Sequence, residues 1–380
     1  MKKLYIISGE ASGDLHASNL MKSMLEKEPS TEFRYWGGNR MAEVYGKPVK
    51  HIADLAFMGF AEVVLNLKTI LGNIKFCKQD IEEYKPDALI LVDYPGFNIR
   101  IAKWAKKKGI PVIYYISPQI WAWKQNRVHI IKKVVDKMLV ILPFEKEFYQ
   151  RFDLEVSYVG HPLLDEIQSF KNRTDKIDLY EKHGLDHRPV IALLPGSRKQ
   201  EIKTKLPIML KSLSPFKEHQ FVVAGAPALA ESFYDQFLKQ YKNVHIIHGE
   251  TYDLLSIATA ALVTSGTATL ETALFNVPEV VCYKGSAISY QIAKRLIKVE
   301  YISLVNLILQ KEAVKELIQH ECTPKNIEQA LQNIMPGGDQ HEKITEDYAT
   351  LMKILGHGGA SDQAAKEVFS FMTKQLEHKA

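Results

Sequence analysis

The stretch Ala88-Leu89-Ile90-Leu91-Val92-Asp93-Tyr94-Pro95-Gly96, residues 88–96, joins a short apolar run to a turn-forming sequence. A run that is apolar at every position is typical of a strand buried on both faces of a parallel sheet. The same pattern returns along the chain, and helical periodicities such as Leu15–Leu25 and Ile99–Lys108 separate the runs. This alternation predicts an α/β fold that is built from strand–helix–strand units.

The apolar runs form two series, one in each half of the chain. In the first half we expect strands at Leu4–Ser8, Phe33–Trp36, Ala88–Val92, Val112–Ile116 and Met138–Leu142. In the second half we expect them at Val190–Leu194, Phe221–Ala224, Val244–Ile247, Ala261–Thr264 and Val280–Tyr283. Two series predict two facing Rossmann-like domains, and Gly and Pro near 160–165 mark their boundary. From Lys311 onward the pattern predicts only helix, with a break at Gly356–Gly359.

Composition limits the class of protein. The 380 residues are enough for two domains, and 46% hydrophobic with 24% charged residues is typical of a globular protein rather than a disordered one. A net charge of +5 is too small for a nucleic-acid binder, so no nucleic-acid partner is expected. Cys77, Cys282 and Cys322 match no zinc or disulfide spacing, which favours the reducing cytoplasm. No apolar run approaches the ~20 residues of a membrane span.

Acidic side chains follow two of the expected strands, where ligands of open parallel sheets bind. The stretch Ser8-Gly9-Glu10-Ala11-Ser12-Gly13-Asp14 brings the carboxylates of Glu10 and Asp14 to one strand end, which suits a hydroxyl-rich sugar acceptor. The alternative is an ordinary strand–helix turn with Ser12 or Asp14 as a helix cap. Asp93 follows the strand 88–92, where partial burial would raise its pKa and suit a general base. Its alternative role is a solvated aspartate in a turn.

A basic residue and a glycine follow the first strand of the second half. In Leu194-Pro195-Gly196-Ser197-Arg198, Gly196 allows close approach of a ligand, and Ser197 lies between it and Arg198. The guanidinium of Arg198 offers several donors in a planar arrangement that matches a diphosphate. We therefore expect a nucleotide-binding contact at this position.

A second anion site is expected in Thr264-Ser265-Gly266-Thr267-Ala268-Thr269-Leu270-Glu271-Thr272-Ala273. A strand ends, Ser265 and Gly266 form a turn, and a helix begins near Thr267. The free N–H groups and positive dipole end of this helix attract phosphate without a metal. Glu271 lies about one turn further along, where a carboxylate can accept both hydroxyls of a ribose. A capping box is the structural alternative.

An apolar stripe at helical spacing runs through 57–76, and lysines accompany it. It includes the side chains of Met58, Phe60, Val63, Val64 and Leu67. A buried core helix and a surface helix that enters anionic lipid both fit this pattern. Trp121 and Trp123 either flank an acceptor pocket or pack in the core.

Six motifs in this order resemble the lipid-A-disaccharide synthase family, whose fold is GT-B, with two Rossmann-like domains. They are Gly9–Asp14, Val92–Asn98, Ser117–Trp123, Gly160–Pro162, Leu194–Arg198 and Ser265–Glu271. The resemblance spans residues 1 to about 320. It implies an inverting transferase that joins UDP-2,3-diacylglucosamine to 2,3-diacylglucosamine 1-phosphate, giving the β-1,6-linked disaccharide 1-phosphate of lipid A and UDP, with no cofactor. The family's donor contacts fall on Asn306 and Gln319.

The resemblance also implies a domain organisation and a location. We expect an acceptor domain at 1–163, a donor domain at 164–340, and helices at 341–380 that return to the first domain and support homodimerisation. A peripheral position on the cytoplasmic face of the inner membrane is expected. Two alternatives remain open, namely a UDP-sugar 2-epimerase of the same architecture and a non-catalytic nucleotide-sugar or lipid-binding protein.

Overall fold

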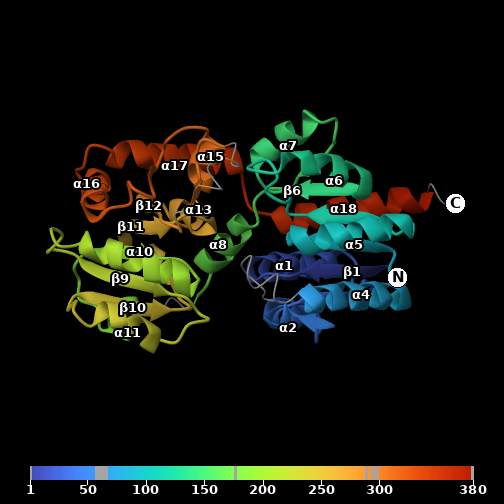
Figure 1. Ribbon diagram of the computed structural model, residues 1–380, viewed down its shortest axis with the longest axis horizontal. Coiled ribbons are helices and arrows are strands. Elements are labelled where there is room, and N and C mark those ends of the chain that lie inside the picture. Colours follow the sequence, from blue (N-terminus) through green and yellow to red (C-terminus); the bar gives the residue numbers. More distant parts are fainter. Residues whose placement is uncertain are drawn as a thin grey trace. The chain divides into compact units, whose positions relative to one another are not determined.

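The computed structural model describes residues 2–55, 67–174, 178–286, 290–291, 295 and 299–377. The chain divides into two compact units, which are Met1–Asp165 with Gly358–Ala380, and Glu166–His357. Each unit contains one parallel β-sheet covered by helices (Figure 1). The predicted α/β architecture with two parallel-sheet units is therefore confirmed.

The first unit is built around a seven-stranded sheet in the order β3-β2-β1-β4-β5-β6-β7. Its strands are β1 (Lys3–Ser8), β2 (Glu32–Gly37), β3 (Lys50–His51), β4 (Ala88–Val92), β5 (Val112–Tyr115), β6 (Lys137–Val140) and β7 (Ser157–Tyr158). Its helices are α1 (Ala11–Lys27), α2 (Asn39–Tyr45), α4 (Leu67–Tyr84), α5 (Pro95–Lys107), α6 (Val128–Val134), α7 (Pro143–Gln150) and α18 (Ala360–Glu377), with short 3₁₀ turns at Ile52–Asp54 and Gln125–Arg127. The chain proceeds outward from β1 to β3 and then returns to β4 on the other side of β1. The switch point of this sheet therefore lies between β1 and β4.

The second unit repeats this plan with a six-stranded sheet in the order β10-β9-β8-β11-β12-β13. Its strands are β8 (Val190–Leu194), β9 (Gln220–Gly225), β10 (Val244–His248), β11 (Ala258–Thr264), β12 (Glu279–Tyr283) and β13 (Lys315–Ile318). Its helices are α9 (Leu179–His183), α10 (Lys199–Lys211), α11 (Ser232–Leu238), α12 (Thr251–Ile257), α13 (Thr267–Leu274), α15 (Leu304–Leu309), α16 (Pro324–Ile334) and α17 (His341–Leu355), while α8 (Leu163–Lys171) begins in the first unit. The switch point here lies between β8 and β11.

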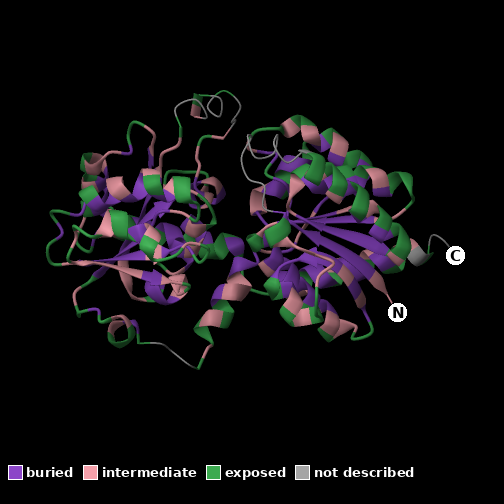
Figure 2. Cartoon of the chain, turned by 60° about the horizontal axis from the view of Figure 1, so that its bottom comes forward, coloured by how far each residue is buried: buried purple, intermediate pink, exposed green. Residues whose placement is uncertain are grey.

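The strands next to the switch points form the centre of each core. Every residue of β4 and of β8 is buried, and most residues of the neighbouring strands β1 and β11 are buried as well (Figure 2). Central parallel strands are covered by helices on both faces, so every side chain needs to be apolar. This explains why the apolar runs 88–92 and 190–194 predict β4 and β8 with the bounds that these two strands have in the structure.

The two C-terminal helices belong to different units. Helix α18 packs along α1 of the first unit, and the Asp165 carboxylate accepts hydrogen bonds from the backbone N–H groups of Ala360 (3.3 Å) and Ser361 (3.0 Å) at its start. Helix α17 packs against α13, α15 and α16 and stays in the second unit. The return to the first unit therefore begins at Gly358, later than residue 341, where the sequence suggests it.

The expectation of helix alone after Lys311 is wrong at Lys315–Ile318, which forms the edge strand β13. Its register pairs Cys282 with Leu317 and Val281 with Glu316. The buried Glu316 carboxylate accepts backbone hydrogen bonds from Ile302 and Ser303, each at 2.9 Å. Glu316 places a charged residue inside the strand, and its hydrogen-bond donors at 302–303 lie outside the strand. The sequence 315–318 therefore shows no apolar pattern that predicts a strand.

Glu279, a buried residue at the start of β12, should make the free energy of unfolding depend on pH. Glu279 is fully buried, and neither of its carboxyl oxygens has a hydrogen bond of good geometry among the described residues, although the Tyr348 hydroxyl lies nearby. Burial, and then the charge of Glu316, raises the Glu279 pKa well above its usual value. The folded state therefore binds a proton more tightly than the unfolded state, and this group's stabilisation is lost as pH rises through the folded pKa.

Replacing Glu279 with Gln should increase the free energy of unfolding at pH 8 by about 1–3 kcal/mol, because the isosteric amide cannot ionise. The gain should be smaller at pH 5, which denaturant unfolding at both values measures. Glu316→Gln is the matched control, because that carboxylate is satisfied by two backbone N–H groups and its loss should destabilise. Equal or lower stability of Glu279→Gln at pH 8 would contradict the interpretation.

Candidate active site: polar motifs at two sheet edges

Asp93 follows β4 directly, at the switch point of the first sheet, where Val92 pairs with Ser8 of β1. Asp93 and Tyr94 both have left-handed backbone conformations, with φ of 45° and 47°. Non-glycine residues rarely adopt this conformation, and it costs about 1–3 kcal/mol per residue at functional sites. These two residues form the sharp turn between the end of β4 and Pro95, the first residue of α5. The strained backbone conformations are what this short connection requires.

Two buried side chains, Asn98 and Tyr114, hold this turn, and neither was predicted as a site residue. The Asp93 carbonyl oxygen accepts hydrogen bonds from Asn98 Nδ2 at 2.8 Å and from the Tyr114 hydroxyl at 2.5 Å. A Cβ atom at Gly9 would overlap the Tyr94 ring, so the first motif and the turn after β4 approach closely. The glycine in the first motif is therefore required for contact between the two strand ends.

Asp93 has the electrostatic character of a base. Burial and then the Glu10 charge raise its pKa to about 6, against the opposing effect of a hydrogen bond from the Tyr94 backbone. A carboxylate with a pKa near 6 is ionised at neutral pH but accepts a proton more readily than an ordinary aspartate. Glu10 is therefore close enough to Asp93 for its charge to act on the Asp93 pKa.

Asp14 has a different position from Glu10. It is buried, and its carboxylate accepts hydrogen bonds from the backbone N–H groups of Gly38 (2.5 Å), Arg40 (3.0 Å) and Met41 (3.3 Å). These donors belong to the first turn of α2, so Asp14 stabilises the start of a neighbouring helix. Asp14 therefore caps α2 rather than the turn that begins its own helix, and Glu10 and Asp93 remain the carboxylates at the strand ends.

The two tryptophans of the Ser117–Trp123 motif differ. Trp121 is buried, and its Nε1 donates to Glu145 Oε1 at 3.2 Å, so it packs in the core. Trp123 is 42% exposed, and the Lys124 ammonium lies 4.1 Å from its ring centroid. Only Trp123 keeps a surface that an acceptor can contact.

The apolar stripe is described only in part. Met58, Phe60, Val63 and Val64, and the Leu67 side chain, lie outside the described residues. In α4, Ile74 is buried while Leu71 is 52% exposed. Among the described residues, no helix combines the length and the apolar character that crossing a membrane requires.

The second sheet carries the basic motif at its switch point, where Leu194 of β8 pairs with Val263 of β11. Gly196 has φ of 113°, and the Glu201 carboxylate packs where its Cβ would be. The Arg198 side chain is 60% exposed, and its Nη1 lies 3.5 Å from Glu201 Oε1. Gly196, Ser197 and Arg198 thus follow the strand that adjoins β11, as the sequence predicts.

Helix α13 begins at this same edge. Gly266 precedes it with φ of 146°, and no side chain caps its first turn among the described residues. Its first N–H groups are therefore available to an anion. Ser265 Oγ donates to the Ile302 carbonyl at 3.0 Å, which fixes the turn. Glu271 lies one turn further along and accepts a hydrogen bond from the Tyr252 hydroxyl at 3.0 Å.

Asn306 and Gln319 have structural partners. Asn306 is buried, and its amide binds the backbone of Ala313 and Val314 and the Glu316 carboxylate at 2.8–2.9 Å. Gln319 Oε1 accepts from the Gly285 N–H at 2.7 Å. These contacts give both side chains a structural role in holding loops together.

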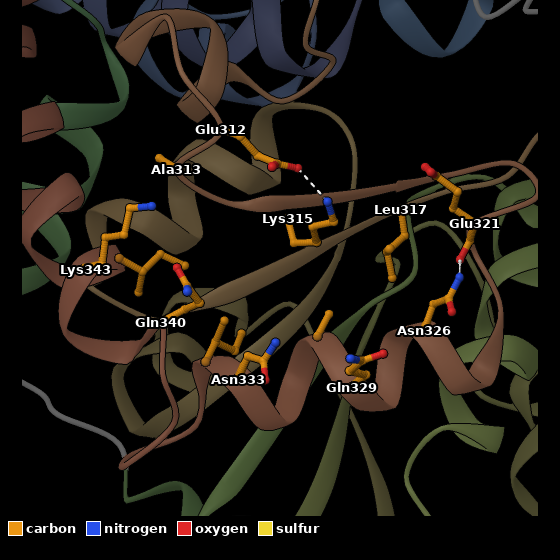
Figure 3. A pocket seen from close by; sticks show the side chains of 13 residues that line it. Glu312, Ala313, Lys315, Leu317, Glu321, Asn326, Gln329, Asn333, Gln340 and Lys343 are labelled. Atoms are coloured by element: carbon orange, nitrogen blue, oxygen red, sulfur yellow. Dashed lines mark hydrogen bonds and ion pairs between the residues drawn. The ribbon is translucent and has the colours of Figure 1, made fainter.

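A pocket of about 500 Å³ lies elsewhere in the second unit, along β13 and α16 (Figure 3). Polar side chains such as Lys315, Asn326 and Lys343 line it, and the Lys315 ammonium is paired with Glu312 at 2.9 Å. Two strands, β12 and β11, separate β13 from β8. The pocket is therefore distinct from the motif-bearing edge, and we do not assign the nucleotide to it.

Two units, each with one parallel sheet that carries polar motifs at its switch point, have the architecture of the GT-B fold. Solved structures with this fold include the UDP-GlcNAc 2-epimerase of Neisseria meningitidis bound to UDP-GlcNAc, with a TM-score of 0.69 and 15% identity over 97% of this chain and 100% of that one. The glycotransferase of kitacinnamycin is similar, with a TM-score of 0.67 and 12% identity over 97% of this chain and 98% of that one. At such low identity these relatives show the fold alone.

Relatives in sequence identify the family more specifically than the fold does. A family model described as lipid-A-disaccharide synthetase matches residues 4–369. The lipid-A-disaccharide synthase of Syntrophus aciditrophicus is 41% identical, with 98% of both chains covered. That of Nitrosococcus oceani is 38% identical over 93% of this chain and 92% of the other. The chain belongs to the lipid-A-disaccharide synthetase family and is a glycosyltransferase of lipid A biosynthesis.

Proposed function

We propose that the first unit of this chain binds 2,3-diacylglucosamine 1-phosphate and the second binds UDP-2,3-diacylglucosamine. Transfer then gives the β-1,6-linked disaccharide 1-phosphate and UDP. The observation that carries the proposal is the difference between the two switch points. Carboxylates gather at the first, whereas Arg198 and the start of α13 provide positive charge at the second. A hydroxyl acceptor needs a base, and a diphosphate leaving group needs cations.

Asp93 is the general base in this proposal. Its carboxylate removes the proton from the acceptor 6-hydroxyl while that oxygen forms a bond to the donor's anomeric carbon. The bond between this carbon and the UDP oxygen breaks, its electron pair leaves with UDP, and the configuration inverts. Protonated Asp93 later returns its proton to solvent. A pKa of about 6, with Glu10 nearby, suits both steps at neutral pH.

The second unit stabilises the departing UDP. The Arg198 guanidinium and the N–H groups at the start of α13 neutralise the negative charge that develops on the diphosphate. Gly266 keeps the backbone open to the phosphates, Gly196 leaves room for the Glu201 carboxylate beside the loop after β8, and Ser265 fixes the turn before α13. Glu271 accepts hydrogen bonds from the ribose hydroxyls.

The acyl chains of both substrates favour a peripheral position on the cytoplasmic face of the inner membrane, with the 57–76 stripe in contact with lipid. In the described part of the stripe, exposed Leu71 and the exposed lysines 68 and 75 agree with this. Serine at both Val64 and Leu67 should lower binding to vesicles containing phosphatidylglycerol by about 100-fold, because each apolar side chain contributes roughly 1.5 kcal/mol.

Co-sedimentation with these vesicles measures the effect, and thermal unfolding shows whether the fold is intact. Ile354→Ser is the matched control, because Ile354 is an exposed apolar residue of the second unit. Unchanged vesicle binding would contradict the membrane role, as would a collapse of the unfolding transition, since that identifies a core helix.

Product analysis tests the proposed reaction. The protein is incubated with both acylated glucosamine substrates, UDP release is followed, and the linkage is assigned by NMR. We expect UDP release only with acceptor present, and a β-1,6-linked product. UDP-sugar epimerised at C2 without acceptor would favour the epimerase alternative, and UDP binding without turnover would favour a binding protein; both results would overturn the proposal.

A further inference from the structure

Glu271 has a hydrogen-bond partner that neither the motif nor the fold requires. Helix α12 brings Tyr252 against α13, and the Tyr252 hydroxyl donates to Glu271 Oε1 at 3.0 Å. Glu271 follows the anion-binding start of α13 by about one turn. The bond therefore fixes one carboxylate oxygen at the edge of the sheet to which we assign the nucleotide.

Aromatic rings from two other segments hold Tyr252 in place. Its ring centroid lies 5.6 Å from that of Phe170 at the end of α8 and 5.3 Å from that of Phe275, which follows α13. Phe170 and Phe275 are themselves 5.6 Å apart. Arg173 lies over Phe170 and forms an ion pair with Asp253 at 2.8 Å. The Tyr252 hydroxyl is thus aimed by packing from α8, α12 and the end of α13.

The Glu271 pKa depends on the hydrogen bond from Tyr252. Burial raises the pKa of Glu271, and the Tyr252 hydrogen bond opposes that rise. The Tyr252 pKa is raised by burial and then by the charges of Glu271 and of Glu166 on α8. Tyr252 therefore acts as a neutral donor that favours the ionised form of Glu271, and its bond to Oε1 leaves the second carboxylate oxygen for the ribose.

We propose that Tyr252 is a positioning residue for the donor: it holds Oε1 of Glu271 so that the carboxylate presents its other oxygen to the ribose hydroxyls of a nucleoside diphosphate. The inference rests on the proposed function, in which Glu271 binds the ribose. It adds a specificity, because a carboxylate in a fixed orientation discriminates between ribose and 2′-deoxyribose. Tyr252 itself donates to Glu271 and packs against Phe170 and Phe275, so it acts on the donor through Glu271.

Binding of UDP and of 2′-deoxy-UDP is measured by calorimetry for the full-length protein and for Tyr252→Phe, Glu271→Gln and the double variant. We expect Tyr252→Phe to weaken UDP binding by about 5–10-fold, the scale of one typical net hydrogen bond, and 2′-deoxy-UDP binding much less. In the Glu271→Gln background the same change should have little effect. The ratio of the two affinities is independent of the fraction of protein that is folded.

The pH dependence gives a second readout. Without the Tyr252 hydroxyl, the Glu271 pKa rises further, so the loss of UDP affinity on acidification should begin at a higher pH. Tyr241→Phe is the matched control. It removes a tyrosine hydroxyl at the opposite, amino end of β10, and should leave the affinity ratio and the pH dependence unchanged.

The affinities distinguish an error in the assigned ribose site at Glu271 from an error in the role of Tyr252. If Glu271→Gln leaves UDP affinity unchanged, the assigned ribose site is wrong, and the role of Tyr252 fails with it. If Glu271→Gln weakens UDP binding but Tyr252→Phe preserves the affinity ratio and the pH dependence, the inference is overturned while the ribose site stands. An equal effect of Tyr252→Phe in both backgrounds would also overturn it, because Tyr252 would then act independently of Glu271.

Discussion

Asp93→Asn is expected to lower turnover by about 10²–10⁴-fold, the usual contribution of general acid–base catalysis, while UDP affinity stays nearly constant. The amide keeps the size of the side chain but accepts no proton from the acceptor hydroxyl. The left-handed turn depends on the Asp93 carbonyl, which Asn98 and Tyr114 bind, so the backbone should be preserved. Steady-state kinetics and UDP calorimetry on the same preparation measure both quantities.

Asp14→Asn is the control for this variant. Asp14 lies on the same unit, but its carboxylate binds the first turn of α2. Its replacement should lower the midpoint of thermal unfolding and leave the turnover of the folded protein within a few-fold of normal. Near-normal turnover of Asp93→Asn would remove Asp93 from the role of base.

Arg198→Ala should weaken UDP binding by about 10–100-fold, the range expected for hydrogen bonds to a charged group. Its guanidinium follows β8 at the switch point and is largely exposed, so the loss should be greatest at low ionic strength. Calorimetric titration with UDP at two salt concentrations provides the measurement.

Arg188→Ala is a matched control, because Arg188 lies before the same strand and binds Asp186 at 2.6 Å. It should bind UDP normally. An Arg198→Ala variant with an unchanged UDP dissociation constant would contradict the donor site, and so would an equal loss in both variants.

The central parts of both sheets were predictable because their strands are buried on both faces. The runs 88–92 and 190–194 are apolar at every position, and the strands have these same bounds. The two-residue strands β3 and β7 are too short to show a pattern, and β13 contains Glu316, whose burial depends on backbone donors at 302–303. Local sequence does not reveal a partner supplied by a remote loop.

The candidate site divides in the same way. Residues directly after central strands were predictable, since adjacent strands of a parallel sheet bring their carboxyl ends together. The partners of those residues were not. Tyr114 reaches Asp93 because β5 lies beside β4, and Tyr252 reaches Glu271 through a contact between α12 and α13. The role of Asp14 was not predictable either, because its partner Gly38, just before α2, lies 24 residues after it.

The pH dependence of kcat/KM for the acceptor, at saturating donor, tests the central claim that Asp93 acts as a base whose pKa is raised by its surroundings. With a pKa of about 6, activity should fall below pH 6 as Asp93 becomes protonated. In Glu10→Gln the midpoint should move to lower pH, because a neighbouring negative charge is removed. A profile that stays flat from pH 7 to pH 4.5, or a midpoint that does not move in Glu10→Gln, would contradict the account.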